Sequence, residues 1–358
     1  MQQSVVSAII FLYIFISAAL LLFNIIYMFS SGVKRRILKY RIYRETEEQR
    51  RLIENLPESM DERYRRRLYA KIKNEEELLI CVEALERNLR TTEKKKLTAY
   101  MLSCRNVIFD AAKIYWKKPA MEKALFAYFI SLIPPEAAEE YRRMGEILLS
   151  FLEHSTVYCR ENVLQALYSL GNADALIQAF QIFQENGWHH ESKLLVDGLT
   201  EFRGDKAAFA RRMWNQRWDE RMKTVLIRFM TRLEEDMSDL ILPELTAGHY
   251  ELCFSAIRYF AVHRNEEAEP ALLKLLQRDG DMAAAAARTL GYYPGGKTKQ
   301  ALKQALHSRN WNVRRNAAES LAMMNLSKEE TAQLCADEDR YAREMFRYVM
   351  ESRGEKEC

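Results

Sequence analysis

Glycine and proline are scarce in this chain, with 12 Gly and 7 Pro among 358 residues. Both residues interrupt helices, whereas the helix-favouring Ala, Leu, Glu, Lys and Arg are plentiful. No stretch shows sustained alternation of apolar and polar residues with β-branched side chains, so little or no sheet is expected. The composition therefore predicts an all-α protein.

Sequence motifs of common catalytic sites are also missing. The chain has no G-x-x-x-x-G-K-[ST], G-x-G-x-x-G, H-E-x-x-H or G-x-S-x-G. Gly295-Gly296-Lys297-Thr298 is faintly similar to a phosphate loop, but it lacks the earlier glycine and the preceding strand, and we interpret it as a turn between helices. We therefore predict no catalytic, cofactor-binding or metal-binding residue. The alternative is a membrane-associated enzyme with an unrecognised active site.

The six cysteines form no C-x-x-C pair, and most lie within apolar helical runs, where cysteine behaves as a small hydrophobe. This distribution predicts neither a disulfide framework nor a zinc site, and it fits a reducing cytoplasm.

Charge is absent from Val5 to Phe29. Twenty-five helical residues span about 37 Å, enough to cross a hydrocarbon core of about 30 Å. A signal peptide would have a basic residue before a shorter apolar run, and Met1 to Ser4 carry none. We therefore predict a retained transmembrane helix over residues 5–29. Ser17 and Asn24 fall on one face of it and could contact a partner helix, although Asn24 could also be wetted near the headgroups.

Six basic residues follow this apolar run: Lys34, Arg35, Arg36, Lys39, Arg41 and Arg44. The positive-inside rule predicts a single-pass protein of the cell (inner) membrane, with its N-terminus outside and its C-terminal part in the cytoplasm. The same side chains are candidates for binding anionic lipid headgroups, at about 1 kcal/mol each. Arg63 and Arg65 to Arg67 extend the basic stretch, which we assign to lipid or to a solvated helix face rather than to nucleic acid.

Further helices are expected along the chain, separated by proline and polar breaks. Val33 to about Asn55 is expected either to continue the transmembrane helix or to form a stiff juxtamembrane helix, and Pro57 ends it. Ser59 or Asp61 is the predicted cap of the next. The others are expected over residues 63–73, 75–90, 97–114, 120–133 and 136–152. Such hairpins with short turns are typical of an α-solenoid.

A repeat of 28 to 32 residues appears in the second half. Its clearest copy begins at Asn310 and places Val313, Ala317 and Leu321 on one helical stripe. The same phase recurs in six triplets: Cys159, Val163 and Leu167; Glu191, Leu195 and Leu199; Met222, Leu226 and Met230; Leu252, Ala256 and Phe260; Met282, Ala286 and Leu290; Tyr341, Met345 and Val349. Gly171 and Gly291 each follow the apolar stripe of a repeat copy, which predicts left-handed helix caps.

This pattern resembles the HEAT-repeat family in its short bacterial form, through Asn310 to Arg314, the pair Ala317-Ala318, and Leu321. The resemblance is good over residues 275–325 and fair over 155–350. It implies a superhelix of hairpins whose groove binds other proteins. It also implies a polar brace between adjacent repeats, for which the candidates are Asn310, Arg314, Asp219 and Arg160. Ala283, Lys223 and Cys253 stand at the arginine position in other copies.

Some HEAT-like proteins are enzymes, but their signatures are incomplete here. The diiron hydroxylases carry several His-Glu dipeptides, and this chain has one, His190-Glu191. DNA glycosylases of related fold use Trp and Asp on a basic groove. We interpret Trp188, Trp214, Trp218 and Trp311 as packing residues.

The predicted organisation is an N-terminal transmembrane helix followed by an α-solenoid of HEAT-like hairpins. Its parts are listed in order: an extracytoplasmic N-terminus (1–4), the transmembrane helix (5–29), a basic juxtamembrane segment (30–95), hairpins of uncertain type (96–154), HEAT-like repeats (155–352) and a tail (353–358). The expected function is a scaffold that recruits or regulates another protein at the membrane, for which a membrane glycosyltransferase of polysaccharide export is one candidate. A third interpretation is a lipid-surface sensor that works through the basic segment.

Overall fold

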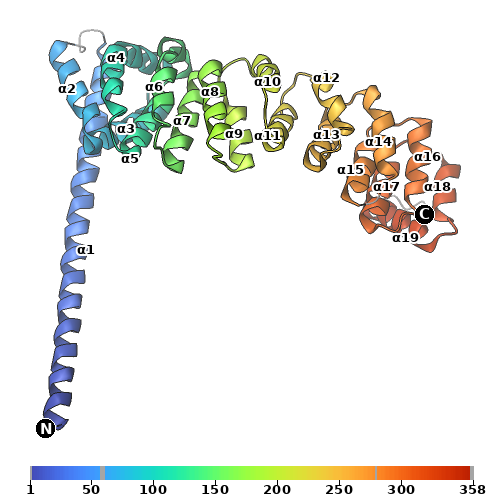
Figure 1. Ribbon diagram of the computed structural model, residues 1–358, viewed down its shortest axis with the longest axis horizontal. Coiled ribbons are helices and arrows are strands. Elements are labelled where there is room, and N and C mark those ends of the chain that lie inside the picture. The colour runs from blue at the N-terminus through green and yellow to red at the C-terminus, as the bar shows by residue number, and fades with distance from the viewer. Residues whose placement is uncertain (1, 57–60, 279, 355–358) are drawn as a thin grey trace. The chain divides into compact units, whose positions relative to one another are not determined.

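The computed structural model describes residues 2–56, 61–278 and 280–354. Within these ranges every regular element is a helix and no residue is in a strand, as the all-α prediction requires (Figure 1). Clustering of contacts divides the chain into two compact units, residues 1–179 (unit 1) and 180–358 (unit 2). The predicted N-terminal segment 1–4 and tail 353–358 lie partly outside the described residues.

Unit 1 begins with one long helix. Its elements are α1 (Gln2–Glu54), α2 (Glu62–Lys73), α3 (Glu75–Thr91), α4 (Lys94–Tyr115), α5 (Ala120–Ser131), the 3₁₀ helix η1 (Pro135–Tyr141), α6 (Met144–Ser150), α7 (Val157–Leu170) and α8 (Ala173–Glu185), which runs into unit 2. By length and composition α1 is the one described helix that could cross a membrane, and its apolar window packs against nothing else in the chain. The helix then continues unbroken to Glu54, which is the first of the two expectations from the sequence.

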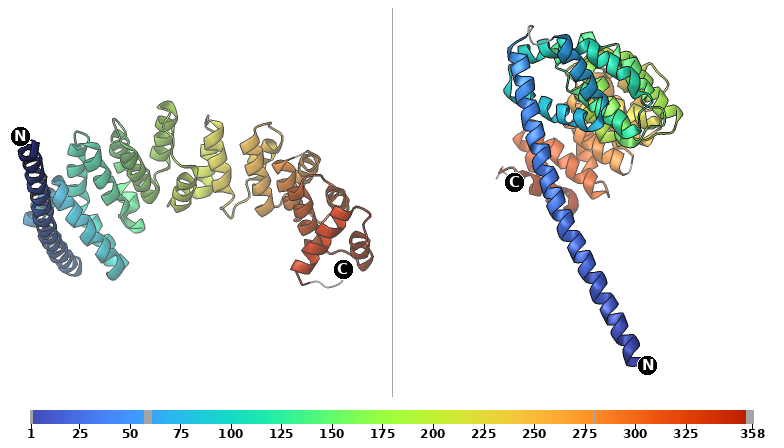
Figure 2. Two further views of the ribbon diagram at one scale, coloured as in Figure 1. Left: turned by 90° about the horizontal axis from the view of Figure 1, so that it is seen from below. Right: turned by 90° about the vertical axis from the view of Figure 1, so that its left-hand side faces the viewer.

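The helices of unit 1 form two layers. In one layer α1 packs on α3, α3 on α5, and α5 on α7. In the other, α2 packs on α4, and α4 on η1. The C-terminal part of α1 is therefore the first helix of the stack, and its N-terminal part leaves the stack as a single rod (Figure 2).

Local signals explain most boundaries in unit 1. Asp61 caps α2 by accepting from the Tyr64 amide at 2.7 Å, whereas the other candidate cap, Ser59, lies outside the described residues. The predicted helix over 136–152 is wrong, because the chain forms η1 and then α6. The break lies where the Asn172 side chain donates to the Arg142 carbonyl at 2.7 Å. That amide fills the space in which a side chain at Gly145 would lie.

Unit 2 repeats one hairpin. Its elements are α9 (Ser192–Glu201), α10 (Lys206–Trp214), α11 (Glu220–Met230), α12 (Ser238–Ile241), η2 (Leu242–Leu245), α13 (Tyr250–Val262), η3 (Glu266–Ala268), α14 (Glu269–Leu276), α15 (Asp281–Leu290), α16 (Gly296–Ala305), α17 (Trp311–Met323), α18 (Lys328–Cys335) and α19 (Arg340–Ser352). The odd-numbered helices α9 to α19 pack successively on one another, and we call them the inner row. The shorter elements between them pack against this row, and the result is an α-solenoid.

The predicted repeat triplets lie on α7 and on the inner row. All three side chains are buried in three copies, as with Val313, Ala317 and Leu321, and the second and third side chains are buried in three more. In the last copy Val349 is buried as predicted, but the first two positions are wrong by one residue, because α19 buries Ala342 and Phe346 while Tyr341 is exposed. The helix begins at Arg340, so its inward face starts one residue later than the copied phase.

Short polar side chains connect neighbouring inner helices. Thr289 Oγ1 donates to the Ile257 carbonyl at 3.2 Å, and Ser320 Oγ donates to the Ala287 carbonyl at 2.8 Å. Gly171 adopts the predicted left-handed cap with φ of 61°. The same prediction is wrong for Gly291, whose φ is −55°. There a glycine is required by close packing, since a β-carbon would lie 2.7 Å from Ser320 Oγ.

The cysteines differ in state. Cys81, Cys104, Cys159 and Cys253 are buried free thiols, as expected for small core hydrophobes. Cys335, at the end of α18, is disulfide-bonded, which the expectation of no disulfide framework did not include.

Candidate binding surface and the anchor junction

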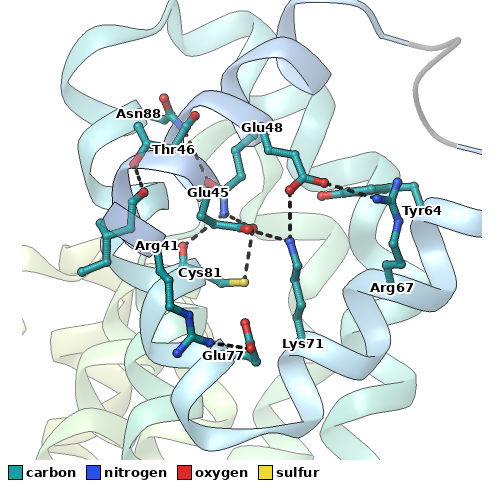
Figure 3. Close-up of polar contacts among 12 residues, drawn as sticks. Arg41, Glu45, Thr46, Glu48, Tyr64, Arg67, Lys71, Glu77, Cys81 and Asn88 are labelled. Carbon is teal, nitrogen blue, oxygen red and sulfur yellow. Dashed lines mark hydrogen bonds and ion pairs between the residues drawn. The ribbon is translucent and has the colours of Figure 1, made fainter. Parts of the chain in front are cut away.

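Charged side chains fasten α1 to the stack where it enters unit 1 (Figure 3). Arg41 bridges Glu76 and Glu77 at the start of α3, with 2.6 Å from Nη2 to Glu77 Oε1. One turn further, Lys71 of α2 donates to Glu45 at 2.6 Å and reaches Glu48 at 3.5 Å. Burial lowers the pKa of Lys71, but the hydrogen bond to Glu45 and its charge outweigh burial and leave that pKa raised. The lysine therefore stays charged and holds the two helices together.

A buried polar layer extends this junction along α1 toward its C-terminus. Asn88 of α3 is fully buried and donates to the Thr46 carbonyl at 3.2 Å and to Gln49 Oε1 at 3.4 Å. Gln49 in turn lies 3.3 Å from the Cys81 carbonyl. Burial, with the charge of Glu45 beside it, raises the pKa of the Cys81 thiol well above its ordinary value, so this cysteine is not a thiolate nucleophile. The junction is thus structural.

The predicted lipid-facing residues separate into two groups. Lys34, Arg35, Arg36, Lys39 and Arg44 are exposed on α1, whereas Arg41 is half-buried and paired with α3. We call the part of α1 before Arg41 the bare part, because among the side chains that the structure describes Ile42 is the first buried one on this helix. Ser17 and Asn24 are both exposed on α1.

The extension of the basic stretch to α2 is not supported. Arg63 and Arg65 to Arg67 are exposed near the start of α2, which runs antiparallel to α1. Arg67 pairs with Glu48 at 3.6 Å, about two helical turns beyond the point at which α1 enters the stack. These arginines therefore lie at the end of unit 1 opposite to the bare part of α1, which favours the solvated-face interpretation over the lipid interpretation.

The brace candidates bond mainly within their own repeat. Asn310 and Asp219 are helix N-caps, accepting from the amides of Asn312 at 2.9 Å and Met222 at 2.7 Å. Arg314 donates to the Ser308 carbonyl at 2.7 Å, and Arg160 donates to the Ser155 carbonyl at 3.4 Å. These arginines hold the loop before their helix.

Contacts between adjacent repeats at these positions are different from a carboxylate–arginine pair. The Arg314 guanidinium lies 5.5 Å from the Tyr341 ring of the next repeat. Asp219 accepts nothing from the preceding repeat through its side chain in the described contacts, but its amide donates to Gln184 Oε1 at 3.0 Å.

A basic hollow of ≈ 500 Å³ lies on unit 2, between α9, α11 and α13. Its lining residues are Lys193, Val196, Arg228, Thr231, Arg232, Ser255 and Arg258. Two of its arginines have acidic neighbours, since Arg232 pairs with Asp197 at 2.7 Å and Arg228 lies 3.7 Å from Glu251. Within the described residues, no ion pair involves Arg258 or Lys193.

Arginines recur at one position of the inner row. Arg228, Arg258 and Arg288 are exposed and spaced 30 residues apart on α11, α13 and α15. We call these three residues the arginine ladder. Consecutive inner helices are in contact, so the ladder presents successive positive charges along neighbouring helices, the first two at the hollow. The signal was available in the sequence, because each arginine stands six residues after the start of a repeat triplet.

No constellation suited to catalysis appears beside this surface. His190 stacks on Phe183 with ring centroids 4.8 Å apart, and Arg221 donates to its carbonyl, so it is a packed core residue rather than a ligand in a cluster. Among residues 2–56, 61–278 and 280–354, no group of three or more His, Cys, Asp or Glu side chains could hold a metal ion.

Comparison with known proteins supports the repeat assignment. Residues 269–347, which comprise α14 to the middle of α19, match the family model for HEAT repeats. No curated protein matches the chain. Among solved structures it is similar to the crystal structure of an engineered protein from the Northeast Structural Genomics Consortium, with 16% identity, a TM-score of 0.34, and coverage of 86% of this chain and 98% of the other.

Proposed function

We propose that this protein is a scaffold anchored by α1 in the cell membrane, whose solenoid lies in the cytoplasm and binds a partner protein there. HEAT repeats are generally protein-binding scaffolds, which supports the general part of this proposal. The apolar, unpacked N-terminal part of α1 and the basic residues after it support the anchor and its orientation. A membrane-bound partner would meet the solenoid at a raised effective concentration.

The observation that carries the binding function is the arginine ladder beside the basic hollow. Arg258 and Arg288 form no ion pair among the described residues, whereas Arg228 lies 3.7 Å from Glu251. The two unpaired arginines leave a positive surface that an acidic surface can neutralise, and arginine is enriched at protein interfaces. The partner we propose is a membrane protein with an acidic cytoplasmic face. A membrane glycosyltransferase of polysaccharide export remains the specific candidate from the sequence resemblance.

Charge reversal of the ladder tests this proposal. Full-length protein would be purified in mild detergent from its native cells, and co-eluting proteins would be identified by mass spectrometry. We expect a membrane protein to co-elute with the wild type in a stoichiometric amount. We expect this co-elution to be lost with Arg258→Glu/Arg288→Glu. The matched control is Lys274→Glu/Arg278→Glu, which reverses two exposed charges at α14, outside the inner row. Loss with both variants, or with neither, would contradict the ladder as the binding surface.

Cys335 provides an independent test of the proposed orientation. The cytoplasm keeps protein thiols reduced, so we expect Cys335 to react with a thiol label in rapidly quenched cells although it is disulfide-bonded in the structure. An oxidised Cys335 in such cells would place the solenoid on the other side of the membrane.

A further inference from the structure

Three turns of unit 1 lie at the end from which the bare part of α1 emerges. Arg41, where α1 enters the stack, pairs with Glu76 and Glu77 just after the turn between α2 and α3. The Tyr115 hydroxyl donates to the Ile72 carbonyl, and Lys118 Nζ lies 3.4 Å from the Lys73 carbonyl, so the turn between α4 and α5 is beside it. Lys123 Nζ lies 3.4 Å from the Glu153 carbonyl, which brings in the turn between α6 and α7.

These turns expose large apolar side chains among lysines. Trp116 is 54% exposed and Met121 is 57% exposed, on either side of the turn between α4 and α5. Lys117 Nζ lies 4.9 Å from the Trp116 ring, and Lys73 is exposed on the neighbouring turn. We call these four residues the rim. Tyr158, after the next turn, is 67% exposed.

This combination of side chains is typical of a membrane interface. Tryptophan prefers the headgroup region because its ring is amphipathic, and lysine is attracted to anionic lipid. The opposite end of unit 1 has exposed lysines without such aromatic side chains in its described part. There Lys94, Lys95 and Lys96 are exposed at the start of α4, and within the described residues no exposed aromatic side chain accompanies them.

The length of the bare helix brings the rim close to the lipid. Arg41 stands twelve positions after Phe29, which corresponds to about 18 Å of helix. The headgroup layer occupies about 5–8 Å of that distance. The remaining gap of about 10–13 Å is of the order of the Debye length of about 8 Å, and a helix tilt of about 20° toward the rim would narrow it.

We propose that the rim is a second membrane contact, in which Trp116 and Met121 enter the headgroup layer while Lys73 and Lys117 bind anionic lipid. Lys73 and Lys117 add positive charge at the end of unit 1 from which α1 carries Lys34, Arg35, Arg36 and Lys39. Glu75 and Glu76 are exposed at the same turn, but these six basic residues outnumber them, and this excess of positive charge selects an anionic lipid surface as the occupant. The inference rests on the proposed membrane insertion of α1. With the span and the rim both held, unit 1 has a fixed orientation on the bilayer.

Tryptophan quenching by lipid tests the contact. Full-length protein would be reconstituted into vesicles of brominated phosphatidylcholine and phosphatidylglycerol, and the quenched fraction of emission would be measured. We expect Trp116→Phe to remove most of the quenched emission. The matched control is Trp311→Phe, which removes another exposed tryptophan, on α17, and should leave the quenched component in place.

The charge dependence is tested by two double variants. Lys73→Gln/Lys117→Gln should lower the equilibrium constant for binding of the rim to lipid, measured from the quenching of Trp116, about tenfold or more. Lys94→Gln/Lys95→Gln should not change this constant. Flotation of each sample with its vesicles reports insertion of α1 separately. Protein that floats while Trp116 is unquenched would overturn the rim contact alone, and would also be the result if the rim binds another protein. Protein that does not float would contradict the proposed anchor.

Discussion

At the scale of single residues, close approach between inner helices depends on small side chains. Gly291, at the end of α15, leaves just enough room for Ser320 of α17, which is itself bonded to the Ala287 carbonyl. A β-carbon at this position would meet Ser320 Oγ at 2.7 Å and the Arg288 carbonyl at 3.2 Å. Neither atom is the free end of a long side chain, so the helices would have to separate.

We therefore expect Gly291→Ala to destabilise unit 2 by about 1–3 kcal/mol, as over-packing does. The matched control is Gly296→Ala, where a β-carbon meets nothing within 4 Å and a helical position favours alanine. Urea unfolding of both variants measures the difference. Equal effects of the two substitutions would show that the approach of α15 and α17 is not tight.

A second residue-scale feature is the N-terminus of α18. Glu330 and Ser327 form a capping box, in which the Ser327 amide donates to Glu330 at 2.9 Å. Lys303 also donates to this carboxylate at 2.9 Å. The bond from the Ser327 amide and the bond from Lys303 lower the pKa of Glu330 to about 2.

A lowered carboxylate pKa adds stability above the unfolded value near 4.5 and loses it as the pH falls toward 2. We expect Glu330→Gln, which keeps the size and an acceptor oxygen, to lower the Tm by about 2–4 °C at pH 7, corresponding to ~1 kcal/mol. The difference from wild type should shrink between pH 5 and pH 2. Calorimetry across this range checks the expectation, which a pH-independent difference would refute.

At the scale of elements, α1 has two halves with different surroundings. Ile53 is 1% exposed within unit 1, whereas Ile37, on the bare part of the same helix, is 53% exposed. The first belongs to the solenoid core and the second contributes nothing to it. We expect Ile53→Ala to cost about 2–4 kcal/mol of stability and Ile37→Ala almost none. Hydrogen exchange of α1 and α3 in detergent would locate the loss, and uniform protection in the Ile53 variant would contradict the docking of α1.

The sequence was informative about elements for identifiable reasons. Apolar stripes placed the inner row, because buried side chains such as Ala256 and Leu290 must recur at helical spacing. The sequence was less informative where one element depends on a distant one. The break before α6 lies where Asn172 donates to the Arg142 carbonyl, and a side chain at position 291 is excluded by Ser320; neither partner is near in sequence.

The sequence predicted the type of binding surface but not the residues that form it. A groove of a HEAT-like solenoid was expected, but its lining was not assigned. Each ladder arginine stands six residues after the start of a repeat triplet, but the sequence does not show that this position is exposed beside a hollow. Only when α11, α13 and α15 are seen to be neighbours does the interval between Arg228, Arg258 and Arg288 become meaningful. Likewise, the two basic regions of unit 1 can be told apart only from the directions of α1, α2 and α4.

At the scale of the whole molecule, the length of the bare part of α1 sets the distance between the membrane and the rim. Seven residues inserted after Gly32 would lengthen α1 by about 10 Å and rotate it by nearly two full turns, which preserves the direction of the rim. We expect this insertion to abolish quenching of Trp116 by brominated lipid while the protein still floats with vesicles and retains its partner in detergent. Unchanged quenching would show that the rim is not held by the length of α1.

The absence of a break in α1 between Gln2 and Glu54 has a mechanical consequence. A flexible linker would let the span and the solenoid turn independently. Here one continuous helix forms both the proposed membrane anchor and the first helix of the stack. If another membrane helix gripped the face containing Ser17 and Asn24 and twisted it, Ile42 and Ile53 would be turned within the stack. Rotation of α1 by a contact within the lipid would thereby be transmitted along the helix and strain the packing of unit 1.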